Sequence, residues 1–301
     1  MSIPTLYSQA SSNRSKTVFF LLVYVALIVA LGYGLAYYFN NGFILIFAGL
    51  FSVVQGFVSY YASDKIALAT AQAELLDEKQ YAAVYRTVEN LAITAGMPMP
   101  RLFIIPGAAI NAFATGRDPK HAAIAITEGA LSKLNDNELT GVLAHELSHV
   151  SNEDIRLTSM VMVMTGLIAT AAGMFQNSVL WGGGRRDDRD NGGGGLILII
   201  GIALSVLAPI AATLIQLAIS RKREYLADEN GVLLTRYPEG LIGALKKIGQ
   251  DSEPVETATN ATAHMYFANP LTGLSLKSLF DTHPPLEDRI RLLEEGSGIK
   301  S

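Results

Sequence analysis

The chain has 301 residues, a net charge of -4 and a charged fraction of only 17%, while half of its residues are hydrophobic. This balance gives no electrostatic basis for binding nucleic acid. The chain has no cysteine, which excludes disulfide bonds and thiolate metal sites and fits a reducing compartment.

Charged residues are absent from four long apolar blocks, each close to the ~20 residues needed to cross the hydrocarbon core of a bilayer. The blocks cover residues 18–38, 43–61, 157–180 and 196–219. The first is too long for the core of a cleavable signal peptide, and tyrosines close the first two blocks as interfacial aromatics do. The pattern predicts an α-helical, multi-pass integral membrane protein with four transmembrane helices in two hairpins.

Basic residues predict the orientation of these spans. Arg14 and Lys16 precede the first span, and Arg221, Lys222 and Arg223 follow the fourth. Because cytoplasmic flanks are enriched in Lys and Arg, both termini and the segment 62–156 are expected in the cytoplasm, at the inner or plasma membrane. The arginines of the Gly-rich loop 182–195, on the opposite side, weaken this rule a little.

The segments outside the spans predict one α+β domain in two parts, 62–156 and 220–301, with the tail and first hairpin at 1–61 and the second hairpin at 157–219. The first part should hold a helix over 66–96 and a small sheet of strands within 101–106, 110–116 and 121–127. Helices are expected at 220–234 and 238–248, then a long loop over 251–282 and a last helix opened by Pro284 and Pro285.

A metal-binding motif stands directly before the third span. Asn135 and Glu138 resemble a capping pair that opens a helix, and on this helix His145 and His149 are four residues apart. Both imidazoles can therefore reach a single ion, with Glu146 beside it. This is the spacing of a zinc peptidase in which Glu146 is the general base.

The third ligand is less clearly specified by spacing. A metzincin would need a histidine at position 155, which is Ile155, so that class is excluded. Glu224 on a later helix is a candidate, with Asp228 at i+4 to orient a ligand histidine. From spacing alone, Glu153 and Asp154 remain alternatives to Glu224.

Together these motifs resemble the HtpX membrane metallopeptidases, relatives of the CAAX prenyl endopeptidases. The resemblance rests on His145–His149, the following membrane hairpin and Glu224-Tyr-Leu-Ala-Asp228, with 111–116 and 283–285 in support. It implies a mainly α, zincin-type (gluzincin) cytoplasmic domain. It also implies one Zn²⁺ per chain held by His145, His149 and Glu224, with Glu146 as the catalytic glutamate.

The expected reaction is hydrolysis of peptide bonds in misfolded or membrane proteins at the cytoplasmic face of the bilayer. Glu146 would take a proton from water and return one to the leaving amine, and His283 would support the oxyanion. The backbone of Asn111, Ala112, Phe113 and Ala114 would pair with an extended substrate. His121 and His264 are expected to be structural or superficial.

Two alternatives remain. One is a CAAX-type processing protease, although four spans do not easily enclose the chamber of that enzyme type. The other is an inactive membrane scaffold with a structural zinc ion, for which an intact Glu146 has no use.

Overall fold

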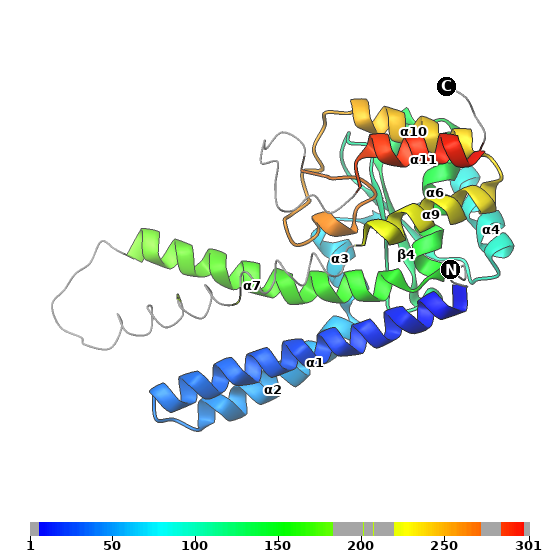
Figure 1. Cartoon of the computed structure of the whole chain (residues 1–301). Helices are drawn as coiled ribbons and strands as arrows, with labels where there is room; N and C mark the ends of the chain where they lie inside the picture. The colour runs from blue at the N-terminus through cyan, green and yellow to red at the C-terminus, as the bar shows by residue number, and fades with distance from the viewer. Residues whose placement is uncertain (1–5, 183–200, 202–206, 208–219, 272–283, 298–301) are drawn as a thin grey trace.

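The computed structural model describes residues 6–182, 201, 207, 220–271 and 284–297. They form a mainly helical molecule in which long helices extend from a domain that carries a small sheet (Figure 1). The helices are α1 (Leu6–Tyr38), α2 (Phe43–Tyr61), α3 (Ser63–Thr70), α4 (Ala82–Ala95), α5 (Glu128–Lys133), α6 (Asp136–Ser151), α7 (Asp154–Gly182), α9 (Arg221–Thr235), α10 (Pro238–Gln250) and α11 (Leu286–Ser297). The strands are β1 (Glu74–Leu75), β2 (Arg101–Ile105), β3 (Ala112–Thr115) and β4 (Ala123–Thr127), and the short 3-10 turns are η1 (Pro119–His121) and η2 (Ala263–Met265).

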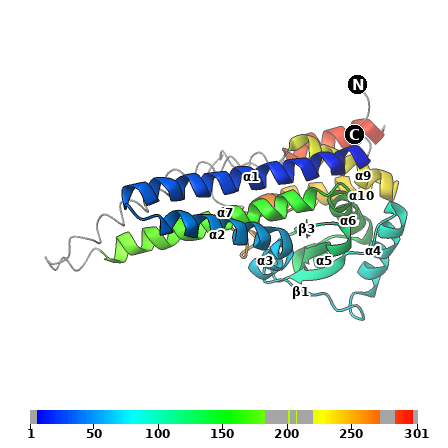
Figure 2. The ribbon, with the colours of Figure 1, turned by 90° about the horizontal axis from the view of Figure 1, so that it is seen from below.

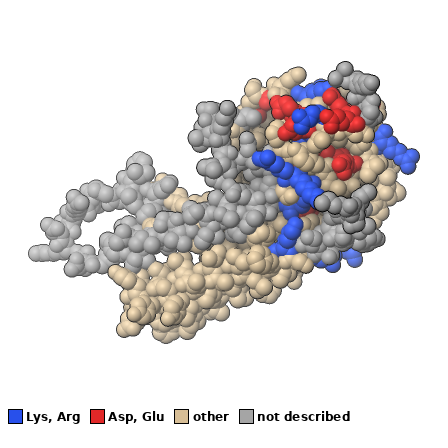
Figure 3. Space-filling model, viewed as in Figure 1, with Lys and Arg blue, Asp and Glu red and all other residues tan. Residues whose placement is uncertain are grey.

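The first two apolar blocks form the expected hairpin, with α1 and α2 side by side in both ribbon views (Figures 1 and 2). Among the described residues, two segments are long and apolar enough to cross a membrane, Asn13–Tyr38 and Phe43–Tyr61. Their large apolar side chains are mostly exposed, and no charged residue colours the visible face of the hairpin (Figure 3). An apolar surface of this extent needs a partner other than water.

The third block is helical throughout, because α7 runs without a break from Asp154 to Gly182. The fourth block lies outside the described residues except for Gly201 and Leu207, and so does the Gly-rich loop beyond Gly182. Two segments of the described part of the chain thus meet the criteria for spanning, and the expected number of four stays a prediction.

The sheet has the strand order β1-β2-β4-β3. Strand β2 runs parallel to β4, whereas β1 and β3 are antiparallel to their neighbours. The three strands expected from the sequence are confirmed. Alternation along β4 sends Ile124 and Ile126 to one face and Ala123 and Ala125 to the other, and both faces are buried. Helices α4 and α6 cover the first face, and α3 with the inner end of α7 covers the second.

The single helix expected over 66–96 is wrong. The structure has α3, then β1, then α4, and Gln72 adopts a left-handed φ of 52° after the end of α3. Leu76 donates its backbone N–H to Leu102 at the sheet edge, and its side chain is buried while that of Leu75 is 67% exposed. Pairing with β2 has overridden the helix propensity of this Ala-rich segment.

Helix α6 lies at the centre of the domain. The capping box predicted from Asn135 and Glu138 is present, and each side chain accepts from the backbone N–H of the other residue. The large apolar residues of α6 are all buried, and the helix contacts the sheet on one side and α9 and α10 on others; these residues are Leu139, Val142, Leu143, Leu147 and Val150. The predicted helices α9, α10 and α11 are confirmed, with bounds that differ by a few residues.

Part of the long loop expected over 251–282 is tightly packed, whereas most of residues 251–260 are exposed or half-buried. Residues 261–268 are all buried, and they include η2. The backbone N–H of Phe267 donates to the carbonyl of Ala112, so this segment extends beyond β3 as an additional neighbour of the sheet. The segment thereby closes one side of the cleft above α6.

Candidate metal centre and active site

The two histidines and the glutamate of the motif lie in the second half of α6, where that helix crosses α9. His145 is 0% exposed and Glu146 is 2% exposed, and the helical spacing places both imidazoles beside α9. Helices α6 and α9 can approach each other closely because Gly231 of α9 faces the backbone of His145. A Cβ at Gly231 would lie only 3.1 Å from the His145 nitrogen. This crossing carries Glu224, in the first turn of α9, to both imidazole rings.

Three donor atoms converge between these helices. The Nε2 atoms of His145 and His149 are 3.1 Å apart, and each lies 3.7 Å from an oxygen of Glu224. Ligand atoms that surround zinc tetrahedrally at about 2.0–2.2 Å are about 3.3–3.6 Å from one another. The three residues therefore fit a zinc ion, and among the described residues they are the one group of His, Asp and Glu that meets this test.

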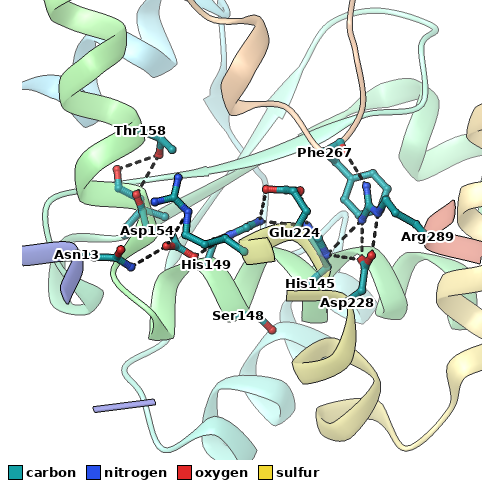
Figure 4. A network of polar contacts seen from close by, with 12 residues as sticks. Asn13, His145, Ser148, His149, Asp154, Thr158, Glu224, Asp228, Phe267 and Arg289 are labelled. Carbon is teal, nitrogen blue, oxygen red and sulfur yellow. Dashed lines mark hydrogen bonds and ion pairs between the residues drawn. The ribbon is translucent and has the colours of Figure 1, made fainter. Parts of the chain in front are cut away.

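The other ring nitrogen of His145 is held by a buried ion pair (Figure 4). Nδ1 donates to Asp228 at 2.8 Å, and Arg289 from α11 donates to both oxygens of Asp228 at 2.6 and 2.8 Å. Arg289 is 0% exposed, donates to the carbonyl of Phe267 and lies over that ring. Asp228 therefore fixes the ring of His145 and directs Nε2 towards Glu224.

These contacts also determine the protonation states of His145 and Asp228. Burial lowers the pKa of His145 to about 4, so the ring is neutral near pH 7 with its proton on Nδ1. Burial alone would raise the pKa of Asp228, but the Arg289 guanidinium outweighs it and holds that pKa well below the ordinary value. A neutral imidazole with a free lone pair on Nε2 is the form that binds a metal ion.

His149 has a separate carboxylate partner, Asp154, which accepts from its Nδ1 at 3.1 Å. Asp154 is thus near the metal centre but on the far side of the ring from Glu224. Glu153, the other alternative ligand, faces away and pairs with Arg14 and Arg156. The structure therefore brings Glu224, and neither of its two alternatives, to the Nε2 atoms of both histidines.

Opposing effects determine the charge of His149. Burial by itself lowers the pKa of this ring, but the carboxylates of Glu224 and Asp154 outweigh it and raise the pKa to about 9. Near pH 7 a metal cation must therefore displace a proton from His149 in order to bind.

Glu146 lies beside the three ligands and lines a small cavity with two of them, His149 and Glu224. Burial raises the pKa of its carboxyl group to about 7, although the nearby His149 and the backbone N–H of Ala114 favour the charged form. The cavity measures about 30 Å³ and is also lined by Thr158, His264 and Tyr266. That volume is close to the ≈ 30 Å³ occupied by one water molecule in the liquid. Glu146 can therefore meet a water molecule inside a closed site.

The strand Asn111–Ala114, expected to pair with substrate, lies at the edge of the sheet beside this cavity. Its first half is already paired within the chain. Ala112 accepts from the N–H of Phe267, and the Asn111 side chain both donates to and accepts from the backbone of Ala268. Phe113 packs against Tyr266. Only Ala114 reaches the cavity, so substrate pairing along the whole segment stays a prediction.

Comparison with known proteins identifies the family. Residues 78–297 match the model of Peptidase family M48. The chain is 42% identical over 297 residues to a protease HtpX homolog of Caldanaerobacter subterraneus subsp. tengcongensis, covering 98% of this chain and 99% of that relative. It is 46% identical over 283 residues to one of Syntrophobacter fumaroxidans, covering 93% and 98%. The chain belongs to peptidase family M48. A structural match, 19% identical with a TM-score of 0.49, is the crystal structure of S. mikatae Ste24p, covering 96% of this chain and 67% of that one.

Membership of family M48 confirms the resemblance and the expected metallopeptidase activity. The chain is a membrane-bound metallopeptidase, and polypeptides are its substrates. Of the predicted site residues, His283 lies outside the described residues. His121 is exposed and bonded to Asp118, whereas His264 is buried and its Nε2 bonds the carbonyl of Thr158. Because His264 also lines the cavity, it is not superficial.

Sequence reasoning missed Arg289 in this M48 site. One signal was present, because Arg289 follows Leu286 by three residues and precedes Leu293 by four, on the apolar face of the last helix. A charged residue on such a face needs a buried partner. Asn13, which donates to Asp154, gave no signal of this kind, since it stands in a polar segment before the first span.

Proposed function

We propose that this M48 metallopeptidase is a zinc-dependent endopeptidase of the cell membrane that hydrolyses misfolded or membrane proteins. Zinc is held by His145, His149 and Glu224, one ion per chain, in a gluzincin-type site. The observation that carries the proposal is the convergence of two Nε2 atoms and one carboxylate within 4.8 Å of one another, with Glu146 beside them. Asp228 and Asp154 accept from the Nδ1 atoms and hold both rings in place.

The chain's own residues supply the proton transfers. Zinc, when bound in such a site, polarises the scissile carbonyl and lowers the pKa of water towards ~7. Glu146 takes the proton of the attacking water, for which the pKa of about 7 is well matched near neutral pH. Glu146 then delivers a proton to the leaving amine. His283 stays our candidate donor to the oxyanion, and the backbone of Asn111–Ala114 our candidate for holding the substrate.

The cavity around Glu146, at about 30 Å³, is far too small for a polypeptide. Part of its wall is the segment His264–Phe267, which also covers the first half of β3. A substrate strand therefore reaches the scissile position only after this segment shifts away from Ala114. A closed resting form protects the general base from solvent, which maintains its raised pKa.

We further propose four spans in two hairpins, with both termini and both parts of the catalytic domain, 62–156 and 220–301, in the cytoplasm. The support is the uncharged stretch 17–62 and the basic residues on either side of the spans. Since the chain has no cysteine, single-cysteine variants report the topology directly. A membrane-impermeant thiol reagent applied to intact cells should label Asn41→Cys, and should label Ser132→Cys only after lysis. Labelling of Ser132→Cys in intact cells contradicts this orientation.

The activity is tested with full-length protein in detergent, using casein and added zinc. Wild type should cleave casein in a zinc-dependent way, and Glu146→Gln should bind zinc equally but lose about 10²–10⁴-fold in rate, the usual contribution of a general base. The matched control is Glu89→Gln, exposed on α4, which should be as active as wild type. Cleavage by Glu146→Gln at the wild-type rate would rule out the mechanism, and a zinc-loaded wild type without activity would favour the scaffold.

A further inference from the structure

The inner end of α1 is part of the surroundings of the metal site. On α1, Asn13, Thr17, Phe20 and Tyr24 are 2–7% exposed, whereas Phe19, between them, is 61% exposed. The spacing of four, three and four residues makes one helical stripe. Tyr24 packs with Met160 and Met164 of α7, so the stripe faces that helix. The first span therefore lies along α7 in a fixed register (Figure 2), and Asn13 is the first residue of that span.

Asn13 contacts the turn that joins the catalytic helix to α7. Its Nδ2 donates to Oδ1 of Asp154 at 2.7 Å and to the carbonyl of Asn152 at 2.9 Å. The other oxygen of Asp154 accepts from Nδ1 of His149 at 3.1 Å. Asp154 is only 2% exposed. A continuous series of hydrogen bonds thus connects the first membrane helix to an imidazole of the metal site (Figure 4).

We propose that Asn13 is a positioning residue for the metal: it holds Asp154 against His149, so that the packing of α1 on α7 sets the affinity of the site. The proposal rests on the assignment of His149 as a metal ligand. A carboxylate has freedom to rotate, and the Nε of Arg223 lies 3.4 Å from the same Oδ1, farther than the Nδ2 of Asn13 at 2.7 Å. Asn13 supplies the short contact that fixes the plane of the carboxylate and leaves Oδ2 for the ring.

Through this contact, the position of Asp154 depends on how α1 is aligned along α7. Sliding α1 along α7 by one residue displaces Asn13 by about 1.5 Å, which is enough to break a hydrogen bond. Arg14, the next residue, pairs with Glu153, whose left-handed φ of 55° forms the same turn. Two consecutive residues of α1 therefore hold the turn that carries Asp154, and the first span has a role beyond anchoring.

The test measures metal affinity, which does not depend on turnover. Full-length protein in detergent is titrated with Zn²⁺ against a competing chelator, and the visible spectrum of the Co²⁺ form reports ligand geometry. Outer partners of ligands typically change affinity 10–100-fold, which we expect for Asp154→Ala. Asn13→Ala, one step further out, should cost about 3–10-fold and shift the Co²⁺ bands. In the Asp154→Ala background the same substitution should cost nothing further, because its effect passes through Asp154.

Thr17→Val is the matched control. It changes the same buried stripe one turn away, without touching Asp154, and should leave affinity and spectrum unchanged. Should Asn13→Ala lower the melting temperature of the metal-free protein, Asn13→Asp replaces it, since it keeps the size, loses the donor and repels Asp154. An Asn13 effect that is absent, or equal in both backgrounds, overturns the proposal. A wild type that binds no zinc overturns the proposed function instead.

Discussion

The two histidines of the metal site are held by different regions of the molecule. His145 is supported by Asp228 and Arg289, which come from α9 and α11 in the second part of the domain and are 2% and 0% exposed. The support of His149 is Asp154, the first residue of α7, and Asn13, which lies two turns into α1; these are the helices of the third and first apolar blocks. One ligand is thus supported by the interior of the domain and the other by the helices of the first and third apolar blocks.

This difference shows what each support can contribute. The His145 support is an ion pair without access to water, where the removal of either charge leaves the other uncompensated. In the His149 support, Asp154 accepts from the neutral amide of Asn13 at 2.7 Å and lies 3.4 Å from Nε of Arg223, next to a ring whose side chain is 16% exposed. We expect the first support to determine whether the site folds, and the second to adjust how well it binds metal.

The largest effect is expected from breaking the His145 support. Arg289→Met leaves Asp228 buried and unpaired, which typically costs about 3–5 kcal/mol of unfolding free energy. Thermal unfolding of the detergent-solubilised protein should show a strongly lowered midpoint and no retained zinc. Arg14→Met, which removes an exposed cation from the other support, should leave the midpoint unchanged. Equal midpoints for the two variants would contradict the distinction between the supports.

A direct comparison of the two carboxylates should give an intermediate effect. Asp228→Asn and Asp154→Asn both keep an acceptor for the ring nitrogen and both lose the charge. We expect losses of zinc affinity of about 100-fold for Asp228→Asn and about 10-fold for Asp154→Asn, the range for such partners. Water can reach the ring of His149 but not that of His145. Chelator competition measures both zinc affinities. A larger loss for Asp154→Asn than for Asp228→Asn would show that the support from α1 and α7 matters more for metal binding.

The smallest effect is expected from changing the crossing of α6 and α9, which brings Glu224 to both histidines. In Gly231→Ala the new Cβ lies 3.1 Å from the nitrogen and 3.3 Å from the Cα of His145. Overpacking of this kind lowers the unfolding free energy by about 1–3 kcal/mol. It should also move Glu224 and Asp228 together relative to α6. Gly249→Ala, whose Cβ meets only ordinary contact, is the control. Unchanged unfolding and zinc binding in Gly231→Ala would mean that the crossing adapts without cost.

The sequence predicted the local parts of this site well. The capping box, the spacing of His145 and His149, and the i+4 relation of Glu224 and Asp228 all depend on a single helix. Alternation was equally informative for the three longer strands. Where two local tendencies competed, as in 66–96, pairing of Leu76 with the distant Leu102 decided the outcome.

The supports of the histidines could not be predicted because they join residues far apart in the chain. Asn13 and Asp154 are separated by 141 positions, and Arg289 and Asp228 by 61. No periodicity relates such pairs, and each forms only once the helices pack. Asp154 therefore remained an alternative metal ligand on spacing, although it lies at the opposite nitrogen of the ring.

The central claim is that His145, His149 and Glu224 form one zinc site, and counting bound zinc per chain tests it most directly. Full-length wild type and Glu146→Gln should each retain one zinc ion after dialysis, and Glu224→Ala should retain none. Glu229→Ala, exposed on the same helix, should behave as wild type. One zinc ion per chain in Glu224→Ala, bound with wild-type affinity, would show that the third ligand lies elsewhere.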